Sequence, residues 1–98
     1  MRFHTKVVGV TYEGRQEYIK KMKIGERIRL ERDRNNPHDP NAIKVVNEKG
    51  EHIGFISKDL AGKLAERMDK GERFQAAVSD ITGSPETVLG VNLLIRSL

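Results

Sequence analysis

The chain has 98 residues, 37% of them hydrophobic, which is enough material for one domain with a single core. It contains no cysteine, which excludes disulfides, cysteine-ligated zinc and thiol catalysis, and no apolar run approaches the roughly 20 residues that a membrane-spanning helix needs. Eighteen Lys and Arg outnumber fourteen Asp and Glu, so the formal net charge is +4 and polyanionic partners are favoured.

The first half of the chain predicts four strands and one short helix. Apolar and charged residues alternate with period two, as Ile28 and Leu30 do with Arg27 and Arg29, which is typical of strands with one wet face. We expect a strand over 3–10, a helix over 15–22 and strands over 27–31, 42–47 and 51–56. A hairpin turn over 48–50, with glycine placed for positive φ, joins the last two strands.

The second half predicts a helix followed by two strands. Ser57 is a good N-cap residue and Gly71 a stop signal, so we expect a helix over 57–69. One of its faces carries an apolar stripe: Leu60, Ala61, Leu64, Ala65 and Met68. Strands are expected over 74–81, with a bulge near Asp80, and over 88–95. The fold class is therefore mostly β with two helices, a small OB-like or SH3-like antiparallel barrel of about six strands in one domain, residues 1–98.

The stretch between the second and third strands is the candidate functional loop. Pro37 and Pro40 restrict the backbone, and the Asn and Asp side chains around them are typical of turns, so we expect a rigid loop. Arg32 and Arg34 at its entrance and Lys44 at its exit favour a recognition edge. The alternative is an elaborate turn whose Asn and Asp side chains satisfy only their own backbone. Likewise, Tyr12 is either a packing residue at the rim of the barrel or a platform for a base or sugar.

Four segments in order resemble the HIRAN domain family. The loop Arg32–Val45, RDRNNPHDPNAIKV, is similar to the family signature R-D-x-x-N-P-x-D-x-N-A-I-x-V. The segments VGVTY at 8–12, IGFI at 53–56 and DLAGKLA at 59–65 resemble its first strand, the strand before its helix, and that helix. The resemblance implies an OB-like, nucleic-acid-binding module that is found alone or fused to ATPases and nucleases.

The resemblance also implies roles for individual residues at the 3′-hydroxyl end of single-stranded DNA. Tyr12 corresponds to the aromatic residue that stacks on the terminal base, Asn36 and Asp39 to groups that contact the end nucleotide and its hydroxyl, and Lys44 lies on the adjoining strand. Three positions depart from the family pattern: Thr11 replaces a basic residue, His38 an aromatic one and Phe55 a histidine of the phosphate pocket. Because His38 can still stack, that change is mild, whereas Arg34 or Arg15 would have to replace the lost phosphate donors.

Two classes of function remain after the others are set aside. The three histidines are not at metal-ligand spacing, and Asp33 and Asp39 do not fit a calcium loop or an enclosed catalytic pair, so we expect no metal, no cofactor and no enzyme activity. The first hypothesis is a single-stranded DNA-binding module acting in DNA repair or replication, with RNA as an alternative ligand, an ATPase or nuclease as an alternative protein partner, and no membrane. The second is a protein-interaction module that uses the 32–44 loop or an exposed barrel edge. Since residues 1–6 lack the apolar segment of a secretory signal, we expect a soluble, cytoplasmic protein.

Overall fold

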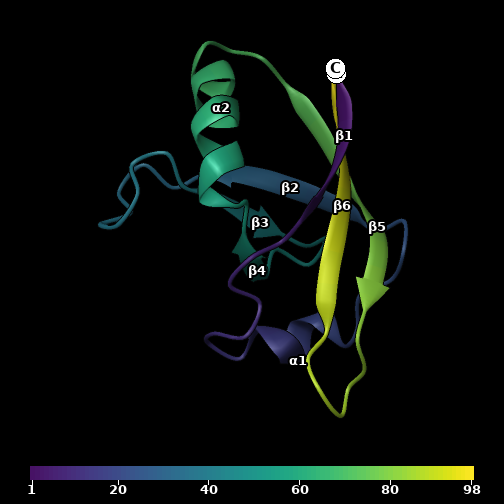
Figure 1. The fold of residues 1–98 in the computed structure, drawn as a ribbon. Helices are drawn as coiled ribbons and strands as arrows, with labels where there is room; N and C mark the ends of the chain where they lie inside the picture. Colours follow the sequence, from purple (N-terminus) through teal and green to yellow (C-terminus); the bar gives the residue numbers. More distant parts are fainter.

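Six antiparallel strands and two helices make up the computed structural model, which describes residues 1–98 (Figure 1). In chain order they are β1 (Arg2–Lys6), α1 (Arg15–Ile19), β2 (Arg27–Arg32), β3 (Ile43–Val46), β4 (His52–Phe55), α2 (Lys58–Asp69), β5 (Phe74–Thr82) and β6 (Gly90–Ser97). The strands form one sheet in the order β1-β6-β5-β2-β3-β4. This confirms the predicted fold class.

The sheet curls so that its two outermost strands approach each other. Just after β1, Val8 pairs with Phe55 at the end of β4, and each backbone N–H donates to the other residue's carbonyl oxygen at 2.9 Å. Gly54 makes this approach feasible, because a Cβ there would lie 2.6 Å from the Val8 carbonyl oxygen. The half-barrel is therefore joined at one point between its edges, and only part of each edge strand stays available for adding another strand.

The core lies between the inner face of the curled sheet and α2. Alternate residues of β6, namely Val91, Leu93 and Ile95, are fully buried, as the period-two pattern predicts. From α2, Ala61, Leu64 and Ala65 are buried in the same cluster. The apolar stripe of the predicted helix is thus confirmed as core. No helix has both the length and the apolar character needed to cross a membrane.

Several element boundaries differ from the sequence prediction. β1 ends at Lys6 instead of residue 10, because Gly9 adopts a positive φ of 71° that a strand does not allow. α1 ends at Ile19, three residues early, and β6 runs over 90–97 instead of 88–95. The predicted bulge is confirmed, since the β5–β6 register shifts between Val78 and Asp80.

Candidate functional site

Side chains within the β2–β3 loop hold its backbone in shape. The Asn36 Oδ1 atom accepts hydrogen bonds from the backbone N–H groups of His38 at 2.8 Å and Asp39 at 3.0 Å. Asp39 Oδ1 accepts one from the Asn41 N–H at 2.9 Å, and Asn36 Nδ2 donates to Asp33 Oδ2 at 3.2 Å. These atoms close turns, as the structural alternative for the loop predicted. The second carboxylate oxygen of Asp39 makes none of the loop's hydrogen bonds and remains available to a ligand.

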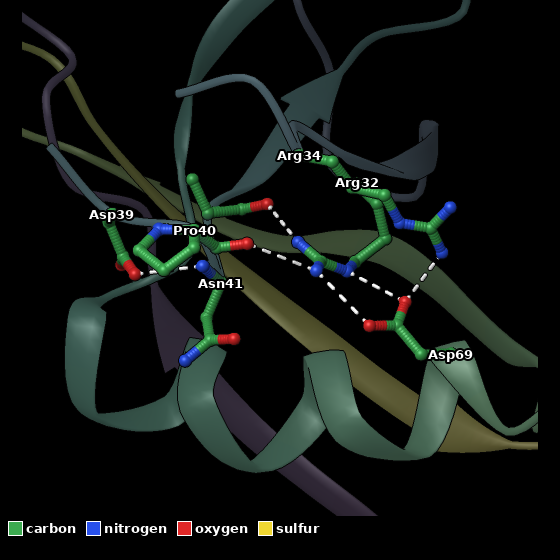
Figure 2. A network of polar contacts seen from close by, with 7 residues as sticks. Arg32, Arg34, Asp39, Pro40, Asn41 and Asp69 are labelled. Carbon is green, nitrogen blue, oxygen red and sulfur yellow. Dashed lines mark hydrogen bonds and ion pairs between the residues drawn. The ribbon is translucent and has the colours of Figure 1, made fainter. Parts of the chain in front are cut away.

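Arg32 and Arg34 connect this loop to the end of α2 through Asp69 (Figure 2). Arg32 donates through Nε to Asp69 Oδ1 at 3.0 Å and through Nη2 to Oδ2 at 3.2 Å, while Arg34 Nη2 donates to Oδ1 at 2.6 Å. Arg32 also donates to the carbonyl oxygens of Ala42 and Pro40, at 2.9 and 3.1 Å. The hydrogen bonds from Arg32 and then Arg34 lower the pKa of Asp69 to about 2.

The two arginines expected at the entrance of the loop therefore differ in their availability. The Arg32 side chain is only 11% exposed and all three of its nitrogen atoms are engaged within the protein, whereas Arg34 is 65% exposed and uses one nitrogen. Asp69 accepts hydrogen bonds from both arginines, but the sequence does not identify it as part of the site. It lies 35 residues from Arg34 in the chain and resembles any solvated carboxylate at the end of a helix. Only a three-dimensional contact identifies its role.

A hollow of about 320 Å³ lies where the loop faces the junction between β1 and β4. Half of its eight lining residues are apolar and half are polar or charged: Val8, Asn36, His38, Asp39, Ala42, Phe55, Ile56 and Lys58. Four of the predicted site residues are thus brought together: Asn36, His38, Asp39 and Phe55. Lys58, the first residue of α2, is an addition that the sequence did not single out. Lys44 lies opposite Phe55 in the β3–β4 pair, so both side chains project from the same face.

Tyr12 lies beside this hollow and is 67% exposed. A Cβ built on Gly9 would lie 4.0 Å from the Tyr12 ring and 3.8 Å from the Phe55 ring, so the two rings flank Gly9. The turn that carries Tyr12 has two successive residues with positive φ, Glu13 at 56° and Gly14 at 73°. An exposed aromatic ring on a tight turn, next to an apolar hollow, offers a flat surface on which another ring can stack.

The buried side chain of Arg15 supports the turn that carries Tyr12. It is 6% exposed, donates through Nη1 to the Gly9 carbonyl oxygen at 2.7 Å and pairs through Nη2 with Glu13 at 3.2 Å. Its guanidinium lies 5.4 Å from the centre of the Phe55 ring and 3.5 Å from Nδ1 of His52. Burial, followed by the charge of Arg15, lowers the pKa of His52, whose Nε2 donates to the Gly54 carbonyl oxygen at 2.8 Å. Arg15 is thus a buried support for the Tyr12 turn and does not present a free phosphate donor.

A family model and solved structures match nearly the whole chain, and curated relatives match about two thirds of it. The family model described as the HIRAN domain matches residues 1–96. Human helicase-like transcription factor (HLTF) is 46% identical over 63 residues, 64% of this chain. Its rabbit (Oryctolagus cuniculus) counterpart is 43% identical over the same length. This chain spans only 6% of the length of those curated relatives.

Solved structures agree with the sequence match. The crystal structure of the HIRAN domain of human HLTF has a TM-score of 0.78 at 32% identity, covering 98% of this chain and 74% of that one. The NMR structure of the HLTF HIRAN domain in its DNA-bound conformation has a TM-score of 0.72 at 32% identity, covering 98% and 73%. A Lactobacillus plantarum protein at 20% identity, with a TM-score of 0.72 and coverage of 98% and 99%, shares the fold.

Proposed function

The chain belongs to the HIRAN domain family, and on that premise we propose that it is a DNA-binding module that holds the end of an unpaired strand. One HIRAN domain, that of HLTF, has a structure in a DNA-bound conformation. The observation that carries the proposal here is the hollow itself, which has a rigid polar loop on one side and the exposed ring of Tyr12 beside it.

Tyr12 supplies the stacking surface for the terminal base. Stacking of a base on an aromatic ring is worth about 1–3 kcal/mol and tolerates any base, because every base has a π-face. Since Arg15 and the two positive-φ residues fix the turn, the ring needs little ordering when a base arrives. His38 on the rim of the hollow offers a second ring.

Asp39 accepts a hydrogen bond from the hydroxyl group of the strand end. A carboxylate repels phosphate, so its place in a basic site is explained by a hydroxyl donor, which only a sugar or chain end provides. Its Oδ1 atom holds the Asn41 N–H, which orients the free Oδ2 atom for that donor. Asn36 shapes this part of the loop by binding the N–H of Asp39.

The phosphates near the end are met by Arg34, Lys44 and Lys58. Arg34 is exposed, Lys58 lines the hollow at the N-terminus of α2, and Lys44 shares a face with Phe55. The helix N-terminus adds its own attraction for an anion close to Lys58. Arg32, whose donors are engaged within the protein, serves to hold the loop in place.

A titration of matched oligonucleotides tests this function. Single strands of equal sequence that end in a 3′-hydroxyl or a 3′-phosphate are titrated by fluorescence anisotropy over a range of salt concentrations. We expect the hydroxyl form to bind more tightly, and the logarithm of the affinity to fall with the logarithm of salt with a slope of about −2 to −3, as for three or four phosphate contacts. Equal binding of the two ends contradicts end recognition, and no binding of either favours the protein-interaction alternative. An RNA strand of the same sequence tests whether the 2′-hydroxyl is accepted.

The family context extends the proposal to the cellular role. A domain that holds free DNA ends fits repair or replication, alone or with an ATPase or nuclease as partner. The same titration on a replication-fork substrate with a free 3′ end tests the role in repair or replication.

A further inference from the structure

A row of exposed side chains leads away from the hollow along the outer face of β1. Arg2, His4, Lys6 and then Val8 are exposed, while Phe3 and Thr5 are half-buried and Val7 is buried, so every second residue points outward. Val8 lines the hollow. At about 3.3 Å per residue, the row extends about 20 Å from the hollow to Arg2.

The neighbouring strands continue this surface with more positive charge. Arg96 of β6 lies opposite Arg2, and Arg27 of β2 lies opposite Ala77 of β5, which itself lies opposite Leu94. A shallow hollow of about 290 Å³ separates Arg27 from Arg96. We call this surface the outer basic face and define it by its cations on β1, β6 and β2, with β5 lying between the last two strands: Arg2, Lys6, Arg27, Arg29 and Arg96.

Most of these cations have no carboxylate partner. Arg29 pairs with Glu31, whereas Arg96 donates to the amide oxygen of Gln75 at 2.8 Å. Arg2, Lys6 and Arg27 are in no ion pair. Exposed like charges without partners repel one another, and a polyanion that replaces their counterions relieves that cost.

We propose that the outer basic face is a second DNA-binding surface, which takes the phosphate backbone of a duplex. No Tyr, Phe or Trp side chain points outward on β1, β6 or β2, and the imidazole of His4 is the one ring on these strands that does, so the face offers no series of platforms for successive unpaired bases. Its centre is formed by the small or apolar side chains of Ala77 and Leu94, which let a backbone approach between the flanking arginines. The row along β1 connects this face with the hollow, so the duplex continues from the strand end that the proposed function places there.

A duplex without any free end separates this face from the hollow. A DNA dumbbell, closed by a loop at both ends, is titrated against the unmodified protein and against a variant carrying Arg2→Gln, Arg27→Gln and Arg96→Gln. Four unpaired cations predict a salt slope of about −3 to −4 for the unmodified protein and about −1 for the variant, with affinity at least about tenfold weaker. A matched control, Lys21→Gln, Lys63→Gln and Lys70→Gln, removes the same charge from exposed positions elsewhere and should leave most of the affinity intact.

Three outcomes overturn the proposal. The first is that the dumbbell does not bind the unmodified protein, and the second is that both triple variants lose affinity equally. The third is that the outer-face variant keeps its affinity for the dumbbell but loses binding to phosphatidylserine vesicles, which would make the face a membrane-binding surface. The three arginines are exposed, so the variant should fold, and unfolding by heat checks this. The single changes Arg27→Gln and Arg96→Gln give the same test in smaller steps. Because a dumbbell has no strand end, its binding tests the outer basic face independently of end recognition. Either proposal can therefore fail without affecting the other.

Discussion

Asp69, the last residue of α2, accepts hydrogen bonds from Arg32 of β2 through both of its carboxylate oxygens, at 3.0 and 3.2 Å. Arg32 in turn holds the carbonyl oxygens of Pro40 and Ala42, where the β2–β3 loop returns to the sheet. The C-terminal end of α2 therefore fixes both ends of the loop that lines the proposed DNA site (Figure 2). This contact makes loop geometry depend on the charge of one exposed carboxylate.

The stability conferred by Asp69 should depend on pH in the acid range. Its pKa in the folded state is about 2, below the ordinary value of 3.8, so its contribution is fully present above pH 4 and is lost as the pH falls towards 2. The variant Asp69→Asn lacks this dependence. The difference in unfolding free energy between the two proteins, measured by denaturant titration from pH 6 to pH 2, should shrink over that window. A constant difference shows that the carboxylate does not titrate as its contacts require.

The ring of Tyr12 should contribute most of the stacking energy. We expect Tyr12→Ala to weaken binding of a short single strand by about 1–3 kcal/mol, and Tyr12→Phe to preserve most of the affinity, because both rings present a π-face. Tyr18, the other tyrosine, is exposed on α1 and provides the control variant Tyr18→Ala. Equal effects of the two alanine substitutions in an anisotropy titration contradict a specific platform at Tyr12.

Local sequence patterns predicted most of the fold, because strand alternation, helix caps and turn residues act over short distances. The buried positions of β6 and α2 follow from such periods, and so does the bulge before Asp80. The contacts that build the site are different, because Arg32–Asp69 and Arg15–His52 each span 37 residues. Neither Asp69 nor the burial of Arg15 leaves a local signal, so their roles as supports became apparent only in three dimensions. The loop motif identified the residues around the hollow, whereas the hollow itself depends on how closely β1 and β4 approach.

The free oxygen of Asp39 should decide between the two kinds of strand end. Asp39→Asn keeps the Oδ1 acceptor for the Asn41 N–H and replaces the charged Oδ2 with an amide, so the turn should persist while the acceptor for a sugar hydroxyl is lost. We expect the preference for a 3′-hydroxyl over a 3′-phosphate to disappear, with an unfolding midpoint close to that of the unmodified protein. Asp39→Ala removes both oxygens, so its midpoint should fall as well, which distinguishes the two roles. A preference that survives Asp39→Asn excludes this oxygen as the reader of the end.

Gly54 should be needed for the junction that closes the half-barrel. A Cβ at this position would lie 2.5 Å from Val7 Cγ1 and 2.6 Å from the Val8 carbonyl oxygen, so Gly54→Ala must push β4 away from the segment that follows β1. We expect a loss of about 1–3 kcal/mol of unfolding free energy, together with weaker DNA binding, since Val8 and Phe55 line the hollow. Gly62 in α2 is the matched control, because a Cβ there meets nothing within 4 Å and Gly62→Ala should stabilise the helix by up to about 1 kcal/mol. Denaturant unfolding of both variants measures the difference, and a neutral Gly54→Ala would show that the β1–β4 junction can open without cost.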